Sequence, residues 1–384
     1  MHKLSMIYLQ IAAFLLGFSI VAKTLASSIR TFVLPRSAQD PITRFVFTRI
    51  RWFFDLRNRW STTFEEQDRV LAMYAPISLL ALVPTWYVLI TIGFTFMFWG
   101  TGIESWGEAY KISGSSLLTL GFNKSEALQH TVLEFAAATI GLMLVALLIA
   151  YIPTMYSAFS RREVEVNKLM VRAGSPPSAV EMILRFHRLD RLDKLPDFWE
   201  RWENWFVEIE ESHTSLAALV FFRSPQPDQS WVTSAGTVLD AAALILSSLN
   251  LPHQVREERV FRGNQLPSDA AAALCLRAGF IALRRIADFF RVDYNQNPHF
   301  PDDPISITRE EFDEACDILA EGGVPLTPDR DKAWQDFAGW RVNYDFVLLT
   351  LARLTNAPYA PWSSDRSAIF VPSDRGTLPG TVVE

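Results

Sequence analysis

The chain has 384 residues and a formal net charge of −6, so its overall charge gives no support for nucleic-acid binding. Its two cysteines, Cys275 and Cys316, cannot build a disulfide framework and lack the spacing of a zinc site. Charged residues make up only 20% of the chain, which is too apolar for an ordinary soluble enzyme of this length. The composition therefore predicts a membrane protein in which apolar segments precede a more polar domain. The patterns along the chain, taken in order, predict an all-α membrane protein.

Three stretches are long and apolar enough to span a bilayer: residues 4–22, 74–99 and 131–159. The first has an alternative interpretation as a signal peptide, because Lys3 precedes it and the small residues ALASS follow it. Its apolar core is longer than that of a typical signal peptide, which favours a retained transmembrane helix over residues 1–26.

Basic residues predict the orientation of these spans. Nine lysines and arginines lie between residues 23 and 73, only two lie between 100 and 130, and four more follow closely after residue 160. Because cytoplasmic loops carry the excess of basic residues, the pattern places the N-terminus outside and the C-terminal domain in the cytoplasm. The expected location is the inner (cell) membrane.

The basic linker, residues 27–73, contains a helical pattern. Arg44, Thr48, Arg51 and Asp55 recur at steps of four and three residues. The opposite side carries aromatic and aliphatic residues: Phe45, Val46, Phe47, Ile50, Phe53, Phe54 and Trp60. This pattern predicts an amphipathic helix at the cytoplasmic headgroups, and the alternative is a helix that packs on the cytosolic domain.

The loop between the second and third spans carries the most informative motif. Residues 106–118 predict a short re-entrant helix, which the five residues Thr119, Leu120, Gly121, Phe122 and Asn123 follow. A dehydrated cation needs oxygen ligands, which rings of backbone carbonyls can supply. Such a backbone needs positive φ angles, and Gly121 and Asn123 are the residues that tolerate them. The Thr119 hydroxyl adds an oxygen, and Phe122 is expected to wedge the loop against the short helix.

The sequence TLGFN, between two such spans, resembles the selectivity filter of the potassium-channel pore family, whose signature is TVGYG. The resemblance covers residues 74–160 and implies an outer helix, a pore helix at 106–118, a filter at 119–123 and an inner helix at 130–159. It also implies a homotetramer around one axis in a lipid bilayer, with potassium or another monovalent cation as the permeant ion and no further cofactor.

Two residues of the pore helix support this resemblance, and two residues at the end of the loop depart from it. Trp106 begins the helix and Ser116 stands where the family often has a hydroxyl residue, so the resemblance assigns both to support of the filter. Asn123 replaces the second glycine, and Lys124 stands where the family usually has an acid. A lysine at the outer mouth repels cations, which leaves room for a non-selective or poorly conducting pore.

Three residues of the third span are candidates for a role at the pore mouth or in gating. Glu134 is an acid inside a membrane span, which indicates either a functional site or a carboxylate within reach of the outer interface. Gly141 and Pro153 divide the span and could act as hinge and kink, although both residue types are common in membrane helices.

The remaining chain predicts an α-helical cytosolic regulatory domain over residues 161–362, with a disordered tail over 363–384. Ser175 is the expected N-cap of its first amphipathic helix. Further helices are expected at 197–210, 236–249, 268–290, 308–321 and 331–355. The domain has neither a GxGxxG nor a GxxxxGK[ST] loop, and no catalytic or metal-binding constellation, so no enzyme activity is expected and its ligand stays unknown.

These patterns predict a cation channel, with potassium as the expected ion, whose filter is residues 119–123 and whose gate responds to the cytosolic domain. The alternative is a non-conducting, membrane-anchored signalling or scaffold protein with a degenerate pore loop. A tethered enzyme is a third interpretation, for which the sequence offers no catalytic motif.

Overall fold

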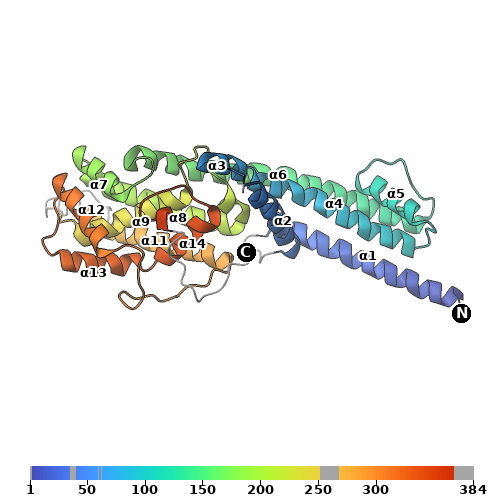
Figure 1. The fold of residues 1–384 in the computed structure, drawn as a ribbon. Coiled ribbons are helices and arrows are strands. Elements are labelled where there is room, and N and C mark those ends of the chain that lie inside the picture. The colour runs from blue at the N-terminus through green and yellow to red at the C-terminus, as the bar shows by residue number, and fades with distance from the viewer. Residues whose placement is uncertain (1, 35–39, 59, 62, 251–267, 367–384) are drawn as a thin grey trace. The chain divides into compact units, whose positions relative to one another are not determined.

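The structure is a computed structural model that describes residues 2–34, 40–58, 60–61, 63–250 and 268–366 (Figure 1). Helices account for 76% of the described residues, which contain no strand. The chain divides into two compact units. The N-terminal unit comprises Met1–Thr62 and Val70–Ser157, and the C-terminal unit comprises Thr63–Arg69 and Ala158–Glu384.

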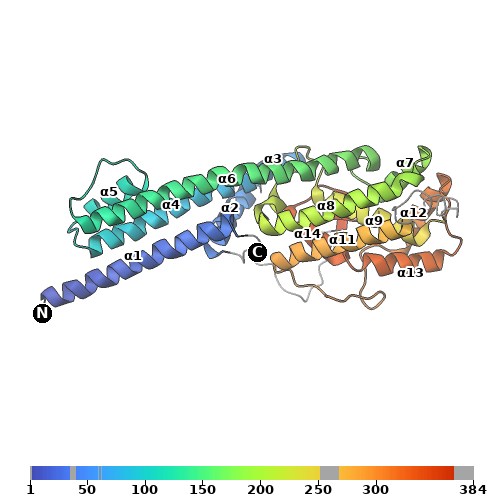
Figure 2. The ribbon, with the colours of Figure 1, turned by 180° about the vertical axis from the view of Figure 1, so that it is seen from behind.

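The N-terminal unit contains helices α1 (His2–Phe32), α2 (Pro41–Asn58), α4 (Tyr74–Gly100), α5 (Trp106–Leu117) and the first part of α6 (Leu128–Ala173). Small residues let α1 and α4 approach closely, because a Cβ on Gly17 would lie 2.3 Å from the Gly93 carbonyl oxygen. Near the other end of α4, a Cβ on Gly100 would lie 2.6 Å from the Gln10 carbonyl oxygen. The two helices are therefore antiparallel, and they run side by side in Figures 1 and 2.

A chain of hydrogen bonds fixes the start of α2 to α1 and α4. The Trp86 indole donates to the Ser27 hydroxyl over 3.1 Å, and that hydroxyl donates to Asp40 over 2.6 Å. The same carboxylate oxygen accepts the Ile42 and Thr43 amides at 3.0 Å, so Asp40 caps the helix.

Four helical stretches are long and apolar enough to cross a membrane: Leu4–Phe32, Phe64–Gly100, Leu128–Ala173 and Trp231–Ser248. Length and composition thus indicate a membrane protein. In the first three, at most a third of the most apolar window is buried within the chain, whereas 89% of the window in the fourth is buried. The fourth stretch is accordingly the core helix of the C-terminal unit, which explains why its composition matches that of a span.

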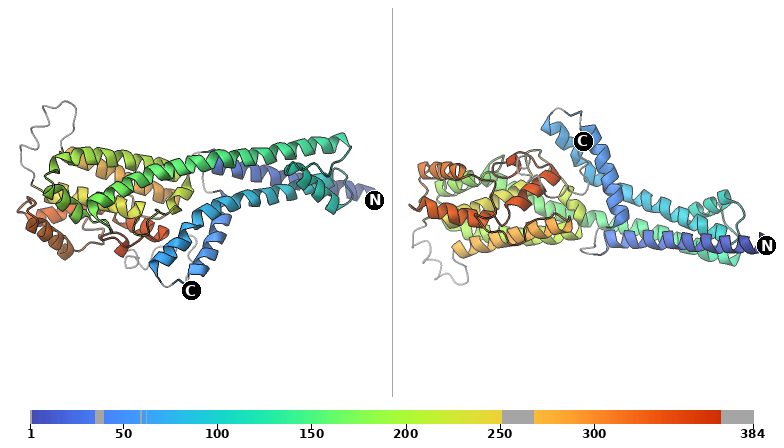
Figure 3. Two further views of the ribbon diagram at one scale, coloured as in Figure 1. Left: turned by 90° about the horizontal axis from the view of Figure 1, so that it is seen from above. Right: turned by 60° about the horizontal axis from the view of Figure 1, so that its bottom comes forward.

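The C-terminal unit is a helical bundle (Figures 2 and 3). It takes in most of α3 (Phe64–Ala72) and the end of α6, and continues through these elements: α7 (Ala179–Arg188), η1 (Leu192–Lys194), α8 (Leu195–Ser215), η2 (Ala217–Phe221), α9 (Trp231–Ser248), α11 (Ser268–Phe289), α12 (Arg309–Glu321), α13 (Arg330–Arg341), α14 (Asp345–Thr355) and η4 (Ser364–Arg366). Helix α9 lies at the centre of the C-terminal unit. Trp199, Trp202 and Phe206 of α8 are almost fully buried in the core of the same unit.

Several boundaries differ from those predicted. Helix α1 runs on to Phe32 rather than ending at 26, and α6 continues from the predicted inner helix to Ala173. Helix α7 is capped by Ser178 rather than Ser175, since the Ser178 hydroxyl accepts the Glu181 amide.

Two further expectations in the C-terminal unit are corrected. The single helix expected at 331–355 is two helices, α13 and α14, because the chain turns between Arg341 and Tyr344 to bring both side chains onto Asp240. The tail does not become disordered at 363, since Ser363 is buried and Arg366 pairs with Glu311. Residues 367–384 of the predicted tail lie outside the described residues.

Candidate functional site: the loop after α5

Aromatic stacking holds the start of α5 against the end of α4. The Trp106 ring stacks on Trp99, with ring centroids 4.7 Å apart and an interplanar angle of 15°. Phe96 meets the same indole edge-on at 5.1 Å. Trp106 therefore fixes the point from which α5 begins.

Helix α5 then runs back along α4 and α6. The Ser113 hydroxyl donates to the Thr91 carbonyl over 2.9 Å. Thr91 lies about 14 Å along α4 from its C-terminal end, at a helical rise of 1.5 Å per residue. At its C-terminal end, Leu117 contacts Gly141, which lies about 20 Å from the start of α6. The Tyr87 hydroxyl donates to the Gly141 carbonyl over 2.7 Å, and Tyr87 is the middle residue of α4. The last turn of α5 thus lies at the middle of α4.

A Schellman motif ends α5. The Thr119 amide donates to the Ser116 carbonyl over 3.0 Å, and the Leu120 amide donates to the Ser115 carbonyl over 2.8 Å. Thr119 has φ +56°, a position that glycine or asparagine normally occupies. A β-branched residue in this conformation is an outlier, and such backbone strain concentrates at functional sites.

Ser115, which the sequence analysis did not single out, organises the loop. Besides the Leu120 amide, its carbonyl accepts the Gly121 amide at 3.4 Å, and its hydroxyl accepts the Asn123 amide at 3.0 Å. Ser115 is 1% exposed, whereas Ser116 is half-buried and uses only its carbonyl here. No local sequence rule pairs a helical serine with an amide eight residues later, so the sequence carried no signal for this role.

From Thr119 to Phe122 the backbone alternates in the sign of φ, although not at the positions predicted. Positive angles occur at Thr119 (+56°) and Gly121 (+71°), whereas Leu120, Phe122 and Asn123 have no positive φ. The expectation for Gly121 agrees with this geometry, and the one for Asn123 is wrong, because Thr119 takes the second left-handed position. No carbonyl oxygen from Thr119 to Asn123 accepts a hydrogen bond from the described part of the chain.

The two large apolar side chains of the loop are exposed. Leu120 is 60% exposed and Phe122 is 67% exposed, so Phe122 does not wedge against α5 as expected. The Thr119 hydroxyl donates to the Leu118 carbonyl over 2.7 Å and closes the turn. The motif thus holds the loop backbone through Ser115 without burying Leu120 or Phe122.

Glu134 ties the return of the loop to α6. One of its carboxylate oxygens accepts the Ser125 amide at 2.8 Å, and the Ser125 hydroxyl shares a 2.7 Å hydrogen bond with His130. Gln129 donates to the Thr101 carbonyl over 2.9 Å and links the same corner to the end of α4. Lys124, just before this corner, is exposed.

The two hinge candidates have different surroundings. A Cβ on Gly141 would lie 1.9 Å from the Leu117 carbonyl oxygen, so this glycine is where α5 touches α6. Pro153 lies inside α6 with an exposed ring, and it removes one amide from the helix ladder.

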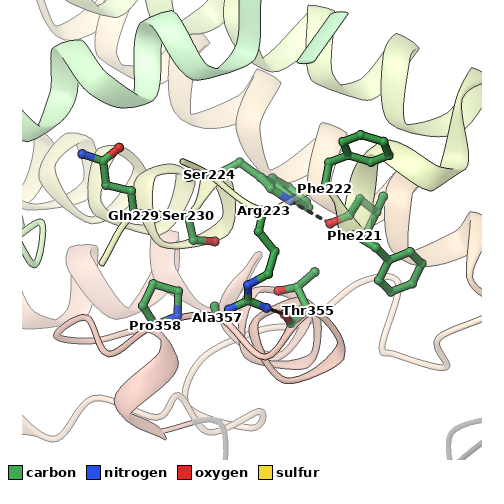
Figure 4. Close-up of a pocket in the computed structure, with 11 residues that line it drawn as sticks. Phe221, Phe222, Arg223, Ser224, Gln229, Ser230, Thr355, Ala357 and Pro358 are labelled. Carbon is green, nitrogen blue, oxygen red and sulfur yellow. Dashed lines mark hydrogen bonds between the residues drawn. The ribbon is translucent and has the colours of Figure 1, made fainter. Parts of the chain in front are cut away.

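The C-terminal unit contains a small pocket around Arg223 (Figure 4). The Arg223 guanidinium donates to the Thr355 and Asn356 carbonyls over 2.8 Å and pairs with Asp68 of α3. The cavity of about 20 Å³ is large enough for one water molecule, and the buried Ser224 hydroxyl at its wall has no hydrogen-bond partner within the described chain.

A larger cavity of about 280 Å³ lies between α7, α9, α12 and Trp362. Its wall includes four carboxylates, those of Glu181, Asp240, Glu311 and Glu314. Among the described residues, no group of three or more His, Cys, Asp or Glu side chains is arranged to hold a metal ion.

Comparisons with protein-family models, with curated proteins and with solved structures find no match for this chain.

Proposed function

We propose that the chain is one subunit of a homotetrameric cation channel, conducting potassium, in which residues 119–123 form the filter. The observation that carries the proposal is the row of carbonyl oxygens from Thr119 to Asn123, none of which is bonded within the described chain. Hydrocarbon cannot satisfy such groups at membrane depth, so they need water, an ion or neighbouring copies of the loop. A ring of four loops would place neighbouring copies side by side and enclose water and an ion between them. The alternating sign of φ would turn successive carbonyl groups toward a common side.

The position of α5 supports the same proposal. Its C-terminal end lies level with the middle of α4, and the carbonyl end of a helix carries about half a negative charge. Four such ends directed at one axis would stabilise a cation where a bilayer is thickest. The exposed Leu120 and Phe122 side chains would pack between subunits.

Helix α6 supports a gating role for the C-terminal unit. It runs unbroken for 46 residues, about 69 Å, and belongs to both units. In the C-terminal unit, the buried Arg162 of α6 donates to the Leu219 carbonyl over 2.8 Å and to the Phe222 carbonyl over 2.7 Å. A change in that unit would therefore act directly on the helix that lines the proposed pore.

Potassium flux into liposomes containing the purified chain tests conduction. Gly121→Ala should abolish flux, because the position has φ +71° and an alanine there is strained even though the space around it is open. Gly114→Ala is the matched control, since Gly114 is helical with open space and should conduct normally. Equal flux in both variants would remove the filter assignment.

A non-conducting membrane anchor is the second candidate, and the exposed Lys124 beside the loop favours it. If the lysine only weakens cation entry, Lys124→Glu should raise flux. If the loop is degenerate, neither the wild type nor this variant should conduct, and the mass in detergent need not correspond to four chains.

A further inference from the structure

Helix α2 has two apolar faces rather than the single underside that its sequence predicts. Val46 and Phe54 are buried on one face, where the Phe54 ring meets Tyr74 of α4 at 5.9 Å. Phe45 and Phe53, expected beside them, are 58% and 62% exposed. Packing on α4 thus uses only half of the apolar surface of α2.

The exposed half forms a continuous face. Trp52 is 64% exposed and Leu56 is 38% exposed, and both lie on the side of Phe45 because they follow it by seven and by eleven residues, close to two and three helical turns. Arg49 lies between them, with its guanidinium 5.2 Å above the Phe45 ring. We call Phe45, Arg49, Trp52, Phe53 and Leu56 the outer face of α2.

The charge of α2 is strongly basic, with four arginines against one aspartate: Arg44, Arg49, Arg51, Arg57 and Asp55. Asp55 pairs with Arg51 at 3.0 Å. Among the described residues, the other three arginines have no carboxylate partner, so an anionic partner would complement this helix.

We propose that the outer face of α2 lies in the headgroup layer of the bilayer and binds anionic phospholipid. Asp40, Ser27 and Trp86 fix α2 to the two candidate spans α1 and α4, which places the bilayer next to this face. Helices that lie in the headgroup layer typically carry aromatic side chains together with arginine or lysine, as this face does. The inference does not depend on conduction, so it holds or fails separately from the proposed function.

Quenching by lipid tests the proposal in the full-length chain reconstituted in liposomes. A fluorophore is attached to Trp52→Cys, since the native Cys275 and Cys316 are buried. A nitroxide near the headgroup is carried either by phosphatidylglycerol or, at the same mole fraction, by phosphatidylcholine. We expect quenching by both lipids and stronger quenching by phosphatidylglycerol, because each arginine near an anionic surface contributes about fivefold to the preference.

The double variant Arg44→Gln, Arg49→Gln should remove most of the preference for phosphatidylglycerol, because only Arg57 then remains of the three arginines without a carboxylate partner among the described residues. Arg188→Gln with Arg191→Gln is the charge-matched control, because both side chains are exposed in the C-terminal unit. Quenching by neither lipid would mean that protein covers the face, from a second copy or from this chain, and would overturn the proposal. A preference that the α2 variant leaves intact would overturn it as well.

Discussion

The Leu117 carbonyl oxygen lies where a side chain on Gly141 would begin, 1.9 Å from the position of its Cβ. The Gly141 carbonyl also accepts the Tyr87 hydroxyl, so α4, α5 and α6 meet at this residue. Gly141 is therefore a point of close packing, whether or not α6 also bends there.

Gly141→Ala should displace the end of α5 and destabilise the chain by about 1–3 kcal/mol, the usual cost of overpacking. The thermal midpoint in detergent measures the loss. Gly114→Ala is again the control and should leave the midpoint unchanged or raise it, since alanine favours a helix. An unchanged midpoint in Gly141→Ala, together with altered flux, would support a hinge instead of a packing contact.

Ser115→Ala should loosen the loop, because it removes the acceptor of the Asn123 amide at a cost of about 1 kcal/mol. Phe122→Cys, combined with each serine variant, measures the change: a looser loop should react faster with a thiol-reactive fluorophore. Ser116→Ala serves as the control, because within the described residues the Ser116 hydroxyl makes no hydrogen bond to the loop. Equal labelling rates in the two serine variants would show that Ser115 does not hold the turn.

The helices were predictable from the sequence wherever an apolar stretch was long enough to span a bilayer, as in α4 and α6. Contacts between residues far apart in the chain were not predictable. Thr119 takes a left-handed φ because its own amide and that of Leu120 donate to the Ser116 and Ser115 carbonyls at the end of α5. These bonds override the usual preference for glycine or asparagine at that position. The pairing of Arg341 with Asp240 likewise follows no local motif, since the two residues are 101 positions apart.

Substitutions of Glu134 can distinguish two roles for its carboxylate, as an anchor of the loop or as a charge that attracts cations. Glu134→Gln keeps an oxygen that can accept the Ser125 amide but removes the charge. If Glu134 only anchors the loop, Glu134→Gln should match the wild type in flux and thermal midpoint. Glu134→Ala should then lower the free energy of unfolding by about 1 kcal/mol, and with it the midpoint. Reduced flux in Glu134→Gln with an unchanged midpoint would show that its charge attracts cations.

The buried Arg341 should be essential for the C-terminal unit. It is 0% exposed, pairs with Asp240 and Asp345, and donates to the Trp362 carbonyl. Arg341→Met leaves two carboxylates buried without their cation and should cost about 3–5 kcal/mol. Tryptophan fluorescence during thermal unfolding measures the loss, and the exposed Arg353→Met is the control.

His213 should make stability depend on pH. Burial, and then the adjacent Arg162, hold the pKa of His213 well below its ordinary value of 6.5. The native imidazole stays neutral while the unfolded one gains a proton, so the free energy of unfolding should fall as pH drops below about 6.5. The slope attributable to this residue is about 1.4 kcal/mol per pH unit.

His213→Gln should flatten that slope, because glutamine keeps polar atoms near Ser212 and Arg162 and does not titrate. Unfolding midpoints measured at pH 5, 6 and 7 give the slope, with the exposed His299→Gln as the control. The comparison depends only on the difference between slopes, so a general loss of stability in the variant does not affect it. Parallel slopes in the wild type, the variant and the control would contradict a lowered pKa of the buried His213 imidazole.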